Sequence, residues 1–144
     1  MVLVACIGLA GPAAPAAAGL LSSTGEVIAI MAGELYTGTA EGHLNGAGTI
    51  AIHAQKKPSL TCNGKFTSSA EKGGKGTLRC TDGSSATFTF KRLTIYKGHG
   101  TGRFTRGPMS FTYGLTAEEA RPHLKLPKGK KIARKGKALE LVSL

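Results

Sequence analysis

The residues best suited to chemistry are two of the three cysteines, Cys62 and Cys80, which both lie in segments where apolar and polar residues alternate. Paired thiols form structural disulfides, bind metals or exchange disulfides, and the last two activities commonly use the spacing C-x-x-C. That spacing is absent from the chain. We therefore predict a structural disulfide between Cys62 and Cys80 if the fold places them opposite each other, with two reduced core cysteines as the alternative.

The histidines are the remaining candidate metal ligands, and they are dispersed along the chain. A metal site needs ligands that converge, and no H-x-x-x-H pattern occurs, so we predict neither a metal nor a cofactor. A small hydrolase would need a polar pocket around His99 or His53, which is a third hypothesis for function. We interpret all four as turn or surface residues: His43, His53, His99 and His123.

The segment 73–77 superficially resembles a phosphate-binding loop. In that loop Lys directly precedes Ser or Thr, whereas here Gly76 separates Lys75 from Thr77. No G-x-S-x-G nucleophile motif occurs either. The only aspartate, Asp82, precedes a glycine and is explained by a tight turn. The sequence therefore predicts a protein that is not an enzyme.

Positive charge is concentrated at the C-terminal end. The formal net charge is +11, and from Arg121 onward there are eight Lys or Arg against a single acid, Glu140. Such a segment favours anionic partners, although a solvated surface is the simpler interpretation. Nucleic acid is not expected, because no aromatic residue follows Arg121 to stack on bases. The candidate polyanion-binding residues are Lys125, Lys128, Lys130, Lys131, Arg134, Lys135 and Lys137.

Short strands are the elements that must position these residues. The 144-residue chain contains 21 glycines and three copies of G-x-G-T, which begin at Gly46, Gly74 and Gly98. Each copy opens a run in which apolar and polar residues alternate, a pattern typical of half-buried antiparallel strands. We predict a mainly all-β fold: an antiparallel meander of short hairpins, forming a single sheet, a small sandwich or an open barrel, with one short helix near the C-terminus.

Hairpin geometry makes the strand pairing predictable, because the numbers of opposed residues have a constant sum. A one-residue slip would scatter the apolar side chains over both faces, so the pattern specifies a register. The predicted apolar face holds Ile50, Ile52, Leu60, Cys62, Phe66, Leu78, Cys80, Phe88 and Phe90. The predicted opposed pairs are Cys62 with Cys80, Phe66 with Gly76, Leu78 with Phe88, Gly76 with Phe90, Ile50 with Cys62, Ile52 with Leu60, Phe104 with Met109, Gly102 with Phe111 and Gly100 with Tyr113.

Glycines fall opposite aromatic residues in this register, as Gly76 does between Phe66 and Phe90. An aromatic ring over a bare glycine covers backbone that would otherwise be exposed. We therefore interpret these glycines as packing devices, which need no ligand to explain them.

The C-terminal region changes in character. Thr116 and Glu119 fit a capping box at the start of a helix, which Pro122 should keep short. The runs 132–133 and 138–142 then flank a basic turn and predict a last hairpin.

The N-terminal residues 1–18 are apolar and uncharged, and they turn into an Ala/Pro/Gly stretch. This stretch is too proline-broken for a good membrane-spanning helix, and it fits an export signal with a small-residue cleavage site at 16–18. Alternatively, the residues before Cys6 resemble a lipobox, so that a lipid on Cys6 would attach the protein to a membrane. Both interpretations predict an exported, periplasmic or envelope-associated protein.

Five short motifs carry a family resemblance: Gly38-Thr39-Ala40, Gly46-Ala47-Gly48-Thr49, Cys62-Asn63-Gly64, Cys80-Thr81-Asp82-Gly83 and Phe111-Thr112-Tyr113-Gly114. Through them the stretch from Thr37 to Gly114 resembles a glycine-rich β-repeat of small bacterial exported proteins and lipoproteins of unknown function. It is also distantly similar to the hairpins of MORN repeats. The resemblance implies an envelope location and a β meander, and it brings no catalytic residues.

These observations divide the chain into three regions: a leader and tether at 1–25, a glycine-rich β domain at 26–115, and a short helix with a basic hairpin or tail at 116–144. The function expected is that of a non-enzymatic cell-envelope module, either structural or binding an envelope protein. The alternative is binding to a polyanion or an anionic membrane surface through the basic C-terminal segment.

Overall fold

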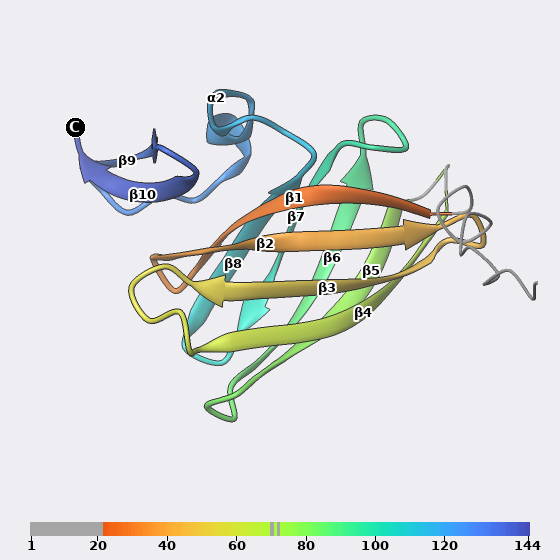
Figure 1. The fold of residues 1–144 in the computed structure, drawn as a ribbon. Coiled ribbons are helices and arrows are strands. Elements are labelled where there is room, and N and C mark those ends of the chain that lie inside the picture. Colours follow the sequence, from red (N-terminus) through yellow and green to blue (C-terminus); the bar gives the residue numbers. More distant parts are fainter. Residues whose placement is uncertain (1–21, 70, 72) are drawn as a thin grey trace, which may run out of the picture.

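The computed structural model describes residues 22–69, 71 and 73–144. Eight antiparallel strands follow one another in chain order around a closed barrel, and a separate two-stranded sheet lies beside it (Figure 1). The barrel closes where β1 pairs with β8, with Val27 opposite Tyr113. The barrel strands are β1 (Ser22–Met31), β2 (Glu34–His43), β3 (Ala47–Ala54), β4 (Thr61–Ser69), β5 (Gly73–Cys80), β6 (Ser85–Arg92), β7 (Gly98–Phe104) and β8 (Gly107–Tyr113).

The predicted antiparallel meander with one short helix is confirmed, and the sheet is more specific than expected. It closes on itself, so that no strand of the meander is left with an unpaired edge. The three G-x-G-T motifs lie at the starts of β3, β5 and β7. The glycine-rich repeat therefore marks every second strand from β3 to β7.

The predicted apolar face is confirmed as the inside of the barrel. All nine residues assigned to it either belong to the buried interior or pack against it. The predicted opposition of Cys62 to Cys80, and of Phe66 to Gly76, is also confirmed.

The other three predicted registers are wrong by two residues. Ile52 lies opposite Cys62, Gly76 opposite Phe88, and Gly102 opposite Met109. Since side chains alternate with a period of two, this slip changes every partner and leaves every face unchanged. The pairs that the structure replaces are Ile50 with Cys62, Ile52 with Leu60, Leu78 with Phe88, Gly76 with Phe90, Phe104 with Met109, Gly102 with Phe111 and Gly100 with Tyr113.

The turns explain the slip. In the β5–β6 turn the backbone N–H of Ser84 donates to the Asp82 carboxylate at 2.9 Å, which centres the turn on Asp82. The β7–β8 turn consists of Thr105 and Arg106, with Phe104 opposite Gly107. The predicted register centres the first turn one residue later and uses Arg106 and Gly107 for the second.

The C-terminal residues 116–144, called here the C-terminal module, begin with the predicted capping box. The N–H of Glu119 donates to Thr116 Oγ1 at 3.2 Å, and the N–H of Thr116 donates to Glu119 Oε1 at 3.1 Å. The predicted last hairpin is also confirmed. The elements of the module are α2 (Ala117–Ala120), the 3₁₀ helix η1 (Arg121–His123), β9 (Lys130–Lys135) and β10 (Ala138–Ser143).

The second half of strand β1, residues 27–31, is buried on both faces. Val27, Ala29 and Met31 point into the barrel, while Ile28 and Ile30 point outward and lie under the C-terminal module. Burying an isoleucine contributes about 1.5–3 kcal/mol, which fixes the module to the barrel wall. The outer cluster consists of Ile28, Ile30, Leu35, Leu115, Ala120, Leu124, Ile132 and Leu139.

The strand β1 also begins within the region assigned above to the leader and tether. Residues 22–25 pair with residues 40–43 of β2, because the meander continues to the end of that strand. Cys6 and the expected cleavage site at 16–18 lie outside the described residues. Among the helices of the described chain, none combines the length and apolar character needed to cross a membrane.

Candidate ligand-binding site at the open end of the barrel

The two ends of the barrel differ. We call the end that carries the β2–β3 turn and the β6–β7 loop the open end, and the opposite one the filled end. Buried side chains occupy the filled end, among them Tyr36, Cys62 and Leu78. The open end contains a cavity of about 320 Å³. This is within the range of roughly 300–1,000 Å³ that is typical of small-molecule sites.

Aromatic rings form the wall of the cavity. The inward-facing positions of β4, β6 and β8 place Phe66, Phe90 and Tyr113 along it, with ring centroids 5.5 Å apart for Phe66–Phe90 and 5.9 Å apart for Phe90–Tyr113. Deeper in the barrel, Phe88 meets Phe111 edge-on at 5.1 Å. Edge-to-face contacts of this kind hold each ring in one orientation. The wall is therefore apolar, and its rings pack against one another.

Glycines on the neighbouring strands make room for these rings. A Cβ added at Gly76 would lie 2.5 Å from the ring of Phe88, and one added at Gly100 would lie 2.6 Å from the ring of Phe111. The predicted packing of rings over glycines is therefore present, with different partners because of the two-residue slip.

Arg92 and Tyr113 are among the polar residues that line the cavity, together with Ser23, Thr24 and His43. Arg92, at the inward-facing end of β6, donates from Nη2 to Ser68 Oγ at 2.8 Å. The hydroxyl of Tyr113 is buried, and no described residue accepts its hydrogen. Burial raises the pKa of Tyr113, and the nearby Arg92 charge opposes that rise. Tyr113 therefore remains a neutral hydrogen-bond donor at physiological pH.

The rim of the cavity is apolar and exposed to solvent. Leu44 from the β2–β3 turn is 80% exposed, and Ile95 and Tyr96 from the β6–β7 loop are 60% and 61% exposed. Large exposed apolar side chains that gather at one place commonly mark an interaction site. Leu44, Ile95 and Tyr96 all line the mouth of the same cavity.

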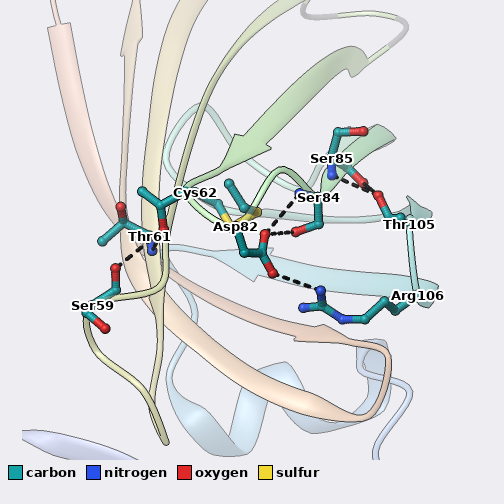
Figure 2. Close-up of polar contacts among 10 residues, drawn as sticks. Ser59, Thr61, Cys62, Asp82, Ser84, Ser85, Thr105 and Arg106 are labelled. Carbon is teal, nitrogen blue, oxygen red and sulfur yellow. Dashed lines mark hydrogen bonds and ion pairs between the residues drawn. A yellow bond between two sulfur atoms is a disulfide. The ribbon is translucent and has the colours of Figure 1, made fainter.

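The predicted cysteine pair lies at the filled end, away from the cavity. A disulfide joins Cys62 and Cys80, whose Cα atoms are 3.9 Å apart. Beside it Asp82 accepts hydrogen bonds from Ser84 and forms an ion pair with Arg106 at 2.8 Å, which ties the β5–β6 turn to the β7–β8 turn (Figure 2). The Ser84 and Arg106 contacts hold the pKa of Asp82 well below its usual range. These contacts hold the two turns together at the filled end of the barrel.

The predicted basic residues all lie in the C-terminal module, and six of the seven are exposed, Lys131 being half-buried. They do not converge on the cavity. Arg134 pairs with Glu26 of β1 at 3.1 Å, and Lys135 pairs with Glu140 at 3.4 Å. Polyanion binding through this segment stays a prediction. Arg134 and Lys135 are already paired with carboxylates.

Two of the four histidines, His99 and His123, lie in contact in the structure. His99 on the outer face of β7 stacks on His123 of η1, with ring centroids 4.0 Å apart and the planes 14° from parallel. Among the residues that the structure describes, no three His, Cys, Asp or Glu side chains are placed to hold a metal ion. The stack therefore joins the C-terminal module to the barrel.

This stack predicts a loss of stability in acid. Burial, the facing His123 and the Lys91 charge lower the pKa of His99 in the folded state. The unfolded chain, with His near pKa 6.5, then binds the proton at higher pH than the folded protein, so acid favours unfolding. We expect the free energy of unfolding to fall as the pH drops below about 6.5, and to fall less in His99→Gln.

Urea unfolding at pH 7.5 and pH 5.0 measures this difference. His43→Gln is the control for loss of an imidazole, because His43 is exposed at the end of β2. An unchanged pH dependence in His99→Gln would show that the stack does not contribute.

The cavity was not predicted from the sequence. Phe66, Phe88 and Phe90 were expected in a filled core, and Arg92 was not among the candidate site residues. A signal was present, because Arg92 continues the alternation of Phe88 and Phe90 and so shares their face. The rim residues Leu44 and Ile95 lie in turns, where periodicity gives no information.

The geometry defines a class of architecture: an eight-stranded antiparallel β-barrel with a cavity at one end. Barrels of eight strands have an interior that is filled by side chains or holds one small ligand. The chain matches no protein-family model and no curated protein.

Among solved structures, the chain is similar to a de novo designed fluorescence-activating beta barrel. The TM-score is 0.52 and the sequence identity 14%, and the match covers 65% of this chain and 92% of that chain. At this identity the likeness shows the fold alone.

Proposed function

We propose that this protein is a non-enzymatic binding module that takes one small apolar molecule into the open end of its barrel. The observation that carries the proposal is the cavity of about 320 Å³ with a wall of aromatic side chains. Ligand sites are commonly apolar cavities with a few polar groups that orient the ligand, and Arg92 and Tyr113 suit that role. The apolar rim supports the proposal, since it offers a path into the cavity.

We also propose that the protein works in the cell envelope after export. The apolar N-terminal stretch supports this, and so does the disulfide, because disulfides persist in oxidising compartments. An envelope protein or an anionic envelope component would then be the partner that supplies or receives the ligand.

The binding proposal is tested with N-phenyl-1-naphthylamine, a neutral apolar dye whose fluorescence rises in apolar surroundings. We expect saturable binding to the full chain. Ala40→Phe, which adds a ring to an inward-facing residue of the cavity, should weaken this binding at least tenfold.

Ala51→Phe is the matched control, because Ala51 lies on the outer face of the adjacent strand β3 and is exposed. It should bind the dye as the unmodified protein does. Absence of saturable binding to the unmodified protein, or an equal loss in both variants, would refute a site inside the barrel.

A further inference from the structure

The polar groups of the cavity are all cationic or neutral. None of the described residues that line it is Asp or Glu, whereas Arg92 and His43 both line it. Among the described residues, no carboxylate forms an ion pair with Arg92. A charge beside an apolar cavity is costly to desolvate unless an anion accompanies it. The site therefore has one positive charge that a ligand could match.

The guanidinium of Arg92 is also incompletely used. It has five N–H donors, and Nη2 is engaged by Ser68 Oγ at 2.8 Å. Ser68 in turn donates to the backbone carbonyl of Gly46 at 3.1 Å, which fixes the side of the guanidinium that faces the wall. The remaining donors can serve a ligand.

The hydroxyl of Tyr113 gives an independent indication. It is buried and no described residue accepts its hydrogen, while the neighbouring Arg92, which can only donate, lowers the pKa of Tyr113 by its charge and by a side-chain interaction with the phenol oxygen. Leaving a buried donor unpaired is unfavourable, so the site is incomplete without an acceptor. A cation and a neutral donor side by side suit one acceptor that carries negative charge.

Resting on the proposed function, we infer that the ligand is an amphipathic monoanion whose carboxylate is held by Arg92 and the Tyr113 hydroxyl. Its apolar part would lie against Phe66, Phe90 and Phe111. At about 320 Å³ the cavity is near the lower end of the range of small-molecule sites, so the ligand is expected to be small.

The test compares octanoate with 1-octanol as competitors of N-phenyl-1-naphthylamine at pH 7.5. The two have the same chain length and differ in the charge of the head group. We expect octanoate to displace the dye at least tenfold more effectively, because hydrogen bonds to a charged group are the strong ones. Arg92→Gln should abolish most of this preference, and Tyr113→Phe should reduce it severalfold.

Lys91→Gln is the control for net charge, because Lys91 is the adjacent residue on the outer face of β6 and is exposed. It should keep the full preference. Tyr113→Phe removes only one hydroxyl and so keeps the test decisive if Arg92→Gln fails to fold.

The two proposals fail in different ways. If the dye binds but octanoate and octanol displace it equally, or if Lys91→Gln loses the preference as Arg92→Gln does, the inference is wrong and the apolar site stands. If the dye does not bind the unmodified protein, the proposed function itself is wrong.

Discussion

Reducing the Cys62–Cys80 disulfide should lower the free energy of unfolding by about 3 kcal/mol. The bond closes a loop with a sequence separation of 18, and a loop of that size restricts the unfolded chain by about this amount. Both cysteines are buried, Cys62 completely, so the bond also lies among the side chains that fill that end of the barrel. Urea unfolding with and without a thiol reductant measures the difference.

The variant Cys62→Ala with Cys80→Ala is the control for the reductant. It keeps Cys6, so any effect of the reductant on that thiol remains, whereas the stability difference should vanish. Equal unfolding midpoints for the oxidised and reduced native protein would contradict a stabilising bond. Titration of free thiols at Cys62 and Cys80 in protein purified without reductant would contradict the bond itself.

Gly38→Ala should destabilise the barrel by more than about 2 kcal/mol, at the upper end of what overpacking costs. A Cβ at Gly38 would lie 1.9 Å from the carbonyl oxygen of Ala51 and 2.7 Å from the Cα of Ile52. These are backbone atoms of β3, so no side-chain rotation relieves the contact and the two strands must separate.

Gly42→Ala is the matched control on the same strand and the same face. Its added Cβ would lie 3.8 Å from the ring of Phe66, which is ordinary van der Waals contact. We expect a change within about 0.5 kcal/mol, since loss of backbone freedom in the unfolded chain offsets small losses. Thermal unfolding of both variants compares them, and similar midpoints would show that close approach at Gly38 is unimportant.

The faces of the strands could be predicted from the sequence, and most of their partners could not. Alternation places Cys62, Leu78 and Phe88 on one face, and a register slip of two residues preserves that placement. The partners depend on how each turn is centred. In the β5–β6 turn that centre is set by hydrogen bonds from Ser84 to Asp82, which the alternation does not record.

Closure of the barrel could not be predicted from the sequence, for a different reason. The pairing of β1 with β8 joins residues such as Val27 and Tyr113, which are far apart in the chain and share no local signal. The unbroken apolar run from Val27 to Met31 is typical of a strand buried on both faces, but it does not indicate which strand would be its partner. Because this run closely follows the apolar N-terminal stretch, nothing local distinguishes a closing strand from the entry to the domain.

The candidate site was only partly accessible to sequence reasoning. The aromatic residues of the wall were found, but a core and a cavity wall have the same periodicity, and only packing distinguishes them. Arg92 was the clue, since a cation on the inner face of a small barrel needs a partner or a ligand.

The measurement that tests the binding site most directly is a methyl NMR spectrum of the protein, recorded with and without N-phenyl-1-naphthylamine. Val27 and Ile50 line the cavity, whereas Ile28 and Ile132 belong to the outer cluster under the C-terminal module. We expect large shift changes for the first pair, because an aromatic dye would lie against them, and small changes for the second. Changes at Ile28 and Ile132 without changes at Val27 and Ile50 would place the dye outside the barrel and contradict the account.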